Sequence, residues 1–252
     1  MRKSLDHDER SERIARNYTY LEHDAQRQFD DQGGVKSTRS RSFDVTVQEE
    51  SPYRRLVARD GKPLSADEEA GEKAKLQRSI EERRRESPSQ CAKRLAEWEK
   101  RRARQRKILR EIPDAFQFTL AGDARIDGRE VWVIRAAPRP DYHARTFEGR
   151  LLTKFAGTLW IDKTEYQWAK VEATAVDTVS FGWVLARMAK GASLEVVQTR
   201  VNDEVWLPRH VLVTYRARIG LVKRISGQSE ITYSGYRKFQ AESHLVPDAS
   251  AH

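Results

Sequence analysis

The residues most able to do chemistry are spread along the chain without a recognisable catalytic or metal-binding spacing. The pair Asp141 and His143 has no second histidine at the spacing of a zinc site. Cys91 is the only cysteine, which excludes a disulfide framework and a multi-cysteine metal site. Lys170 and Glu172 fall on one face of an expected strand, where a surface charge pair is the ordinary outcome. No phosphate-binding glycine loop, nucleophile elbow or zincin helix is present. We therefore expect no catalytic residue, no metal and no cofactor.

The basic excess of the chain is confined to one segment. The 252 residues are 38% hydrophobic and 34% charged, against about 25% charged in a typical globular chain. Residues 83–110 hold twelve Lys and Arg but three Asp and Glu, so this segment carries the whole net charge of +9. A basic segment can bind a polyanion, either nucleic acid or an anionic membrane surface. A solvated helix face is the plainer interpretation.

The candidate basic surface consists of eight side chains: Arg83, Arg84, Arg85, Arg101, Arg102, Arg104, Arg106 and Lys107. They fall on many sides of the expected helix and form no clean stripe, which makes nucleic acid an unlikely partner. Polyanion binding through 83–110 is the alternative function, and it would be steeply salt-dependent.

Most of the chain has the pattern of antiparallel β-structure. Apolar residues alternate with polar ones at 43–47, and strand-like residues also cover 17–30 and 53–58. Turn residues predict hairpins about Asp127-Gly128, 162–165 and 202–204. A last hairpin is expected between strands 221–227 and 228–239.

Two helices interrupt the strands. Ser65 is a predicted N-cap for a helix that runs to about residue 86, and Ser87-Pro88 separates it from a second helix over 89–111, which Ile112-Pro113 ends. We expect these helices to form an αα-hairpin inserted in the β-rich chain. A third, short helix is expected over 183–190, between Gly182 and Gly191.

Long antiparallel strands twist, so a sheet made of them curls. A curled sheet has a concave face that is apolar and must be covered. The helices are the available cover, and a ligand could compete with them for that space. No apolar run approaches the roughly 18 residues of a membrane-spanning helix.

Three short motifs resemble those of the LolA-like outer-membrane lipoprotein carrier and sorting superfamily. The first is Gly157-Thr158-Leu159-Trp160-Ile161-Asp162-Lys163 with Ala169-Lys170-Val171-Glu172-Ala173 as its partner strand. The second is Asp203-Glu204-Val205-Trp206-Leu207-Pro208, and the third is Tyr233-Ser234-Gly235-Tyr236-Arg237-Lys238-Phe239. The resemblance covers about 114–240 well and 17–62 more loosely, and is closest to a bacterial branch with a helical insert.

The resemblance implies a fold and a role. The fold is α+β and mainly antiparallel: a curved, unclosed β-barrel wrapped on helices, as one domain over 1–240 interrupted by the helical insertion 65–111, with a disordered tail at 241–252. The role is non-catalytic binding of lipid acyl chains or of a lipoprotein in a hydrophobic cavity, in the periplasm or cell envelope. The residues after Met1 lack the apolar core that a signal peptide needs. If Met1 is the true start, a cytoplasmic protein is expected. The gating arginine of the family has no clear counterpart here.

Seven apolar side chains are candidates to line or cover the cavity: Trp160, Trp168, Trp183, Leu185, Met188, Trp206 and Phe239. Aromatic and methionine side chains suit loosely specified apolar cargo, and the segment 183–190 is the candidate lid. The alternative is that each of them is an ordinary core residue. If the helices fill the concave face, the protein is a structural or assembly module. This is a third hypothesis, beside lipid or lipoprotein binding and polyanion binding.

Overall fold

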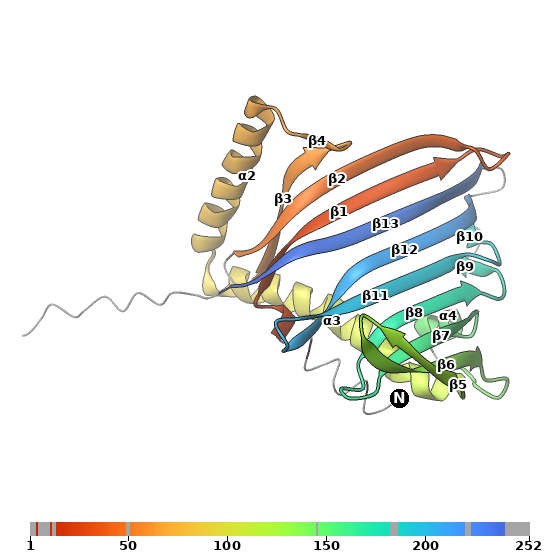
Figure 1. The fold of residues 1–252 in the computed structure, drawn as a ribbon. Coiled ribbons are helices and arrows are strands. Elements are labelled where there is room, and N and C mark those ends of the chain that lie inside the picture. The colour runs from red at the N-terminus through yellow and green to blue at the C-terminus, as the bar shows by residue number, and fades with distance from the viewer. Residues whose placement is uncertain are drawn as a thin grey trace, which may run out of the picture.

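The computed structural model describes residues 4, 11, 14–48, 51–144, 146–181, 186–219 and 223–239. Within them, thirteen strands form one antiparallel sheet that stays open at both edges (Figure 1). The N-terminal strands are β1 (Tyr18–Phe29), β2 (Val35–Gln48), β3 (Ser51–Arg59) and β4 (Lys62–Pro63). The helices are α2 (Ala66–Arg84), α3 (Pro88–Ala115) and α4 (Phe147–Leu152). The remaining strands are β5 (Phe116–Ile126), β6 (Arg129–Pro138), β7 (Phe155–Asp162), β8 (Trp168–Ala175), β9 (Val179–Phe181), β10 (Ala186–Met188), β11 (Ser193–Val201), β12 (Val205–Ile219) and β13 (Lys223–Lys238).

The strand order is β4-β3-β2-β1-β13-β12-β11-β8-β7-β6-β5, and β10 pairs with the end of β12 and with β9. The centre of the sheet therefore joins the first strand to the last, with Tyr18 opposite Lys238 and Phe29 opposite Ser226. Sequence-local hairpins extend the sheet on both sides of this junction. The predicted antiparallel, unclosed and curved sheet with helices is confirmed.

The predicted hairpins at three turns are confirmed, and backbone geometry explains them. Asp127 and Gly128 have φ angles of 49° and 80°, and Asn202 and Asp203 have 49° and 54°. Tight turns with positive φ match the twist of antiparallel strands and favour Asp, Asn and Gly. The third turn, after Asp162, is held by its carboxylate, which accepts the backbone amides of Thr164 and Glu165.

The predicted last hairpin is wrong, because β13 is one continuous strand from Lys223 to Lys238. Gly227 lies in the middle of that strand, between Gln28 on β1 and Tyr215 on β12. A Cβ at Gly227 would come within 2.8 Å of the Tyr215 hydroxyl. The glycine therefore makes room for a neighbouring ring, whereas in the sequence it resembles a turn residue.

The two long helices begin where their serines predict. Ser65 and Ser87 each form a capping box, with Glu68 and Gln90 respectively. The predicted end at Ile112-Pro113 is too early, since α3 continues to Ala115 with Pro113 in its last turn. A proline near a helix end removes one amide donor and leaves the rest of the helix in place. Figure 1 shows that α2 and α3 diverge from their joint, so the insertion is more open than a side-by-side pair.

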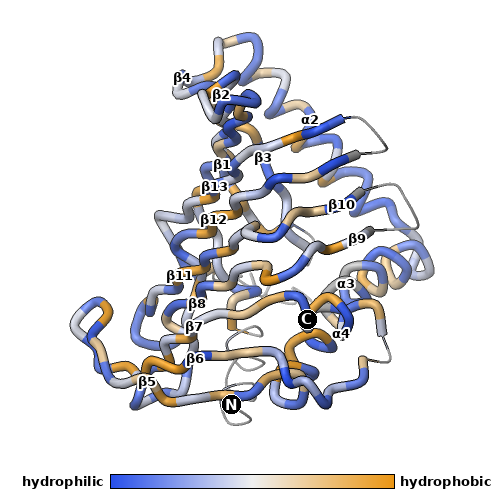
Figure 2. Tube along the Cα trace, turned by 90° about the vertical axis from the view of Figure 1, so that its right-hand side faces the viewer, coloured by the Kyte–Doolittle hydropathy of each residue, from blue (hydrophilic) through white to orange (hydrophobic). Residues whose placement is uncertain are grey.

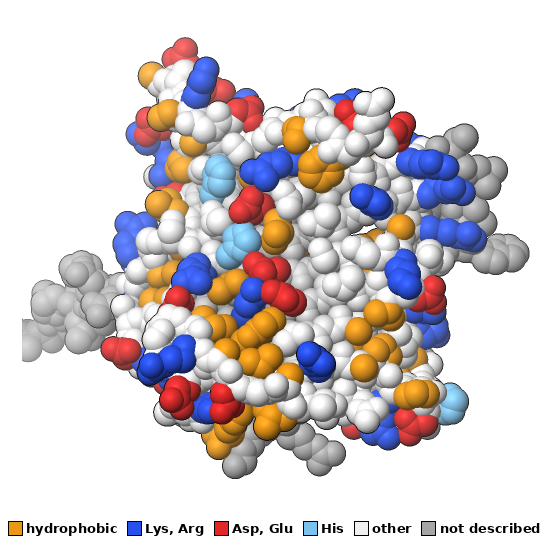
Figure 3. Space-filling model, turned by 45° about the vertical axis from the view of Figure 1, so that its right-hand side comes forward, with side chains coloured by type: hydrophobic (Ala, Val, Ile, Leu, Met, Phe, Trp, Pro, Cys, Tyr) orange, Lys and Arg blue, Asp and Glu red, His pale blue; other side chains and the backbone are white. Residues whose placement is uncertain are grey.

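Figure 2 shows α3 and α4 on the same side of the sheet. The main core lies there: Ala115, Phe116, Ala136, Leu159 and Ile161 are buried, with Ile112 and Leu152 packed against them. On the other face, Val131, Ala169 and Trp206 form a second buried cluster. Figure 3 shows hydrophobic side chains gathered among charged ones on the face without helices.

The predicted short helix over 183–190 is wrong for the residues that the structure describes, because Ala186–Met188 is strand β10. Residues 182–185, and the predicted tail at 241–252, lie outside the described residues. None of the described helices is both long enough and apolar enough to cross a membrane.

Candidate functional site: a cavity between the long helix and the sheet

A cavity of about 620 Å³ lies between α3 and the central strands of the sheet. Leu109 and Arg106 of α3 line one side, and the sheet supplies the other through residues of β1, β11, β12 and β13. The sheet residues that line it include Tyr18, Tyr20, Val196, Leu207, Pro208, Tyr233 and Tyr236, and Trp206 borders it. This is the concave space that the curled sheet was expected to leave.

Three tyrosines form an aromatic wall on the sheet side. The ring centroid of Tyr20 lies 5.7 Å from that of Tyr233 and 5.4 Å from that of Tyr236. Tyr18 stands edge-on to Tyr236 at 6.4 Å. These separations are typical of favourable aromatic pairs. Because Tyr20 lies on β1 and the other two on β13, the wall exists only where the first and last strands pair.

The phenols of the wall are held in their neutral form. Burial raises the pKa of Tyr233 to about 12, and the nearby Glu22 carboxylate adds to the effect. Burial also raises the pKa values of Tyr20 and Tyr236. The Tyr236 hydroxyl donates a hydrogen bond to the carbonyl oxygen of Pro208. A phenol with an ordinary pKa near 10 is already uncharged at neutral pH, and these shifts keep the apolar ring surface uncharged into alkaline solution.

Charged groups border this wall without interrupting it. Glu22 is only 8% exposed and pairs with Arg54 from β3. On the helix side, Arg106 pairs with Glu99 of the same helix. At the strand end, the Tyr18 hydroxyl donates to Glu204 at 2.5 Å and accepts from Asn202 at 2.9 Å. Glu204 also pairs with Lys238 at 2.8 Å, so each of these charges has an opposite partner and none of them is buried and unpaired.

The structure separates the predicted cavity residues from one another. Trp206 borders the cavity on β12, but its side chain packs with Val131 and Ala169 on the opposite face, where its indole N–H donates to the Glu165 carboxylate at 2.6 Å. Trp168 packs in the helix-side core, and Trp160 lies on the opposite face, where the Lys170 ammonium is 5.2 Å from its ring centroid.

The remaining predicted residues lie elsewhere or outside the described part. Met188 is half-buried on β10, and Phe239 is 46% exposed after the end of β13. Trp183 and Leu185 lie outside the described residues. Sequence reasoning missed the tyrosine wall, although Tyr233 and Tyr236 stand in the third motif. The period-two alternation of Tyr18 and Tyr20 could have placed these two residues on one face of a strand. It could not have shown that this strand pairs with the one that carries Tyr233 and Tyr236.

The predicted basic surface is largely engaged in contacts within the chain. Arg83 donates to the carbonyl oxygens of Gln48 and Ser51 at 2.8 and 3.3 Å. Arg85 pairs with Glu81 at 3.7 Å and Arg104 with Glu148 at 2.8 Å. Arg84 and Lys107 are exposed, and the side chains of Arg101 and Arg102 lie outside the described ones. Polyanion binding by this segment stays a prediction.

Among the described residues, no group of three or more His, Cys, Asp and Glu side chains is placed to hold a metal ion. Cys91 is a free, half-buried thiol whose sulfur lies 3.7 Å from Nη2 of Arg94. Lys170 pairs with Glu172 at 2.6 Å and with Glu195 at 3.0 Å, as a surface pair would.

Comparison with known proteins finds structural similarity alone. No family model and no curated protein matches the chain. Among solved structures, the chain is similar to a putative outer membrane lipoprotein-sorting protein domain from Vibrio parahaemolyticus, with 12% identity over 97% of this chain and 94% of that one and a TM-score of 0.34. It is also similar to a DUF1329 family protein from Desulfovibrio piger (10% identity, 94% and 92% covered, TM-score 0.31) and to the LolA superfamily protein NE2245 from Nitrosomonas europaea (10% identity, 94% and 93% covered, TM-score 0.30). The solved structures similar to this chain thus include LolA-like proteins, at low sequence identity and low TM-score.

Proposed function

We propose that the protein is a non-catalytic carrier, which holds the acyl chain of a lipid or lipoprotein in the cavity between α3 and the sheet. The aromatic wall carries this proposal: Tyr20, Tyr233 and Tyr236 face Leu109 across a space of about 620 Å³. That volume falls within the roughly 300–1,000 Å³ of small-molecule sites in proteins.

The chemistry of the wall suits an acyl chain. Each methylene moved from water to an apolar surface contributes about 0.8 kcal/mol. Since the phenols stay neutral, a hydrocarbon that packs against the rings desolvates no charge there. The paired charges of Glu22 and Arg54 at the border lie beside the wall, where a polar end of the cargo could remain in water.

The test is uptake of a fluorescent fatty-acid analogue by the delipidated protein. We expect saturable uptake, followed by the emission of the bound analogue. Leu109→Glu should weaken uptake at least about tenfold, because it places a charge against the apolar cargo. Leu120→Glu is the matched control, since Leu120 is 63% exposed and does not line the cavity. Absence of uptake at micromolar protein, or equal losses in both variants, would contradict the proposal.

The setting follows from the motif resemblance. We infer a periplasmic or envelope protein, with a role in outer-membrane lipoprotein sorting and an anionic membrane surface as a further partner. We also infer that 1–240 is one domain with 65–111 inserted. Fractionation of cells that express the full gene would test the setting, and recovery in the cytoplasmic fraction would contradict it.

A further inference from the structure

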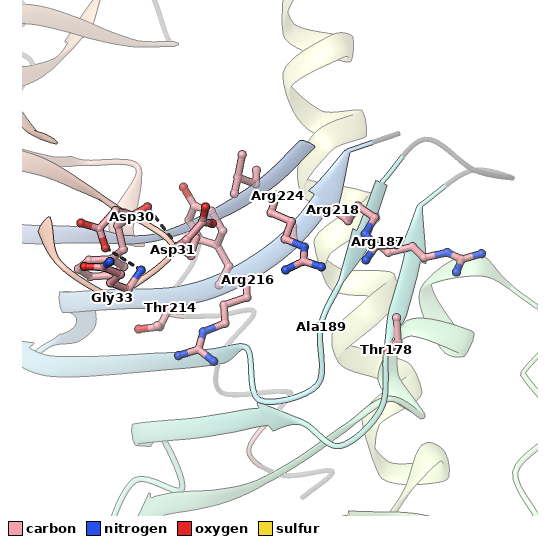
Figure 4. Close-up of a pocket in the computed structure, with 16 residues that line it drawn as sticks. Asp30, Asp31, Gly33, Thr178, Arg187, Ala189, Thr214, Arg216, Arg218 and Arg224 are labelled. Atoms are coloured by element: carbon pink, nitrogen blue, oxygen red, sulfur yellow. Dashed lines mark hydrogen bonds between the residues drawn. The ribbon is translucent and has the colours of Figure 1, made fainter. Parts of the chain in front are cut away.

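A second pocket, of about 740 Å³, lies at the other end of the same central strands. The β1–β2 turn forms one side of it with Asp30, Asp31 and Gly33. Four arginines line the other side: Arg187 on β10, Arg216 and Arg218 on β12, and Arg224 on β13. Figure 4 shows the turn residues on one side and these arginines on the other. The aromatic wall begins at Tyr20, and this pocket begins at Phe29, about 30 Å further along β1 at the usual rise per residue.

Three of the arginines form a row across neighbouring strands. Arg187 is the register partner of Arg218, and Arg218 is the register partner of Arg224. Directly opposite residues of antiparallel strands project from the same face, with Cβ atoms about 4.5–5.5 Å apart. Arg216 projects from this face as well, two residues before Arg218 on β12. Sheet geometry therefore brings four guanidinium groups to one end of one face.

These arginines lack opposite charges of their own. No described residue forms an ion pair or hydrogen bond with the side chain of any of the four, and all four are exposed. Elsewhere on the sheet, arginines face carboxylates: Arg55 pairs with Asp44 at 3.1 Å and Arg41 with Asp24 at 3.5 Å. Like charges placed directly opposite each other on a sheet are destabilising. The row thus retains a repulsion that a bound anion would remove.

The pocket favours a multiply charged anion with several acceptor oxygens. Guanidinium groups donate paired hydrogen bonds that match carboxylate and phosphate oxygens. A single carboxylate balances one guanidinium, whereas a phosphate carries up to two negative charges and more acceptors. The hydroxyl-bearing residues Thr178 and Thr214 also line the pocket. Oδ1 of Asp30 already accepts the amides of Gln32 and Gly34 at 3.0 and 2.7 Å, which occupies it within its own turn.

We propose that the pocket formed by Arg187, Arg216, Arg218 and Arg224 binds a phosphate-bearing group, either free in solution or as the headgroup of a lipid. The proposal does not depend on acyl-chain binding, because the two pockets lie at opposite ends of the strands.

The experiment uses the full chain in phosphate-free buffer. Inorganic pyrophosphate is titrated by calorimetry, and sedimentation measures binding to phosphatidylcholine vesicles with and without phosphatidic acid. We expect saturable binding of at least one probe, and Arg218→Gln should weaken it at least about tenfold, because Arg218 is the centre of the row. Arg125→Gln is the matched control: Arg125 is exposed on β5, has no described partner, and its loss changes the net charge equally.

The outcomes separate the sources of the phosphate. Pyrophosphate binding that Arg218→Gln weakens and Arg125→Gln preserves supports a free ligand. Binding only to phosphatidic acid vesicles, with the same dependence on Arg218, supports a lipid headgroup. Lack of binding to both probes, or equal losses in the two variants, overturns the proposal. A second readout is the unfolding midpoint of each variant, measured with and without the probe that binds. The probe should raise the midpoint of the wild type but not that of Arg218→Gln, whatever the stability of that variant without the probe. Uptake of the fatty-acid analogue should be unchanged in Arg218→Gln.

Discussion

Arg129 holds the fully buried carboxylate of Asp162 with two hydrogen bonds, from Nε at 2.7 Å and from Nη2 at 3.0 Å. The same carboxylate accepts the backbone amides of Thr164 and Glu165 at 3.0 and 2.7 Å. Asp162 is therefore both one half of a buried ion pair and the residue that shapes the β7–β8 turn. Burial opposes its ionisation, but the Arg129 hydrogen bonds and the turn amides lower its pKa below the usual value. These contacts give a physical reason for an aspartate at position 162 of the Gly157–Lys163 motif.

Asp162→Ala should lower the free energy of unfolding by about 1–3 kcal/mol, because it leaves the buried turn amides without an acceptor and leaves Arg129 with only Glu165, 3.5 Å away, as a partner. Urea unfolding followed by far-UV circular dichroism measures this change. Asp141→Ala is the control, since Asp141 pairs with Arg139 at an exposed site and should change the midpoint little. Equal losses of unfolding free energy in the two variants would contradict a larger contribution from the buried pair.

The glycine that opens this motif should also resist substitution. A Cβ at Gly157 would overlap the carbonyl oxygen of Glu172 on the paired strand β8. We therefore expect Gly157→Ala to destabilise the protein by about 1–3 kcal/mol through strand displacement. Gly71→Ala provides the opposite case, because Gly71 lies inside α2 with open space around it, and alanine there should stabilise by about 0.5–1 kcal/mol. Thermal unfolding of both variants tests the pair, and a destabilised Gly71→Ala would contradict the helix geometry.

The alkaline stability of the protein should depend on the aromatic wall. Free tyrosine ionises near pH 10, whereas burial beside Glu22 raises the pKa of Tyr233 to about 12. The folded state then holds the proton more tightly than the unfolded state, so this contribution is complete below pH 10 and is lost as pH rises toward 12. We expect Tyr233→Phe to recover about 1–2 kcal/mol of the alkaline loss, measured by denaturant unfolding between pH 8 and 12. An alkaline profile of Tyr233→Phe that matches that of the wild type would refute the assignment.

Local features of the sequence predicted the local features of the fold. Asp127-Gly128 and Asn202-Asp203 specify their turns through positive φ angles, and Ser65 and Ser87 specify helix starts through their capping boxes. These signals act within a few residues and do not depend on the rest of the chain. The turn predicted at Gly227 was wrong because this glycine accommodates Tyr215 from another strand, which the local sequence does not show.

The candidate sites could not be predicted in the same way. The wall of Tyr20 and Tyr233 needs the β1–β13 pairing, which joins segments about 200 residues apart and has no local signal. The row of Arg187, Arg218 and Arg224 needs the registers of three strands at once, and a shift of one residue would move a side chain to the other face. Composition showed where the basic excess lies, yet it could not show which arginines lack partners.

The basic helix can be tested apart from the arginine row, because it carries exposed lysines with no ion pair to a described residue. Lys93, Lys100 and Lys107 recur every seven residues on α3, so they follow one line along the helix, and none has an ion pair with a described residue. If this line attracts an anionic membrane surface, Lys100→Glu with Lys107→Glu should abolish vesicle binding at low salt, whereas Lys36→Glu with Lys62→Glu should weaken it only through net charge. Wild-type binding should also fall steeply between 50 and 200 mM salt, as phosphate contacts require. Sedimentation with phosphatidylglycerol vesicles measures both effects, and equal losses in the two charge-matched pairs would assign the attraction to net charge alone.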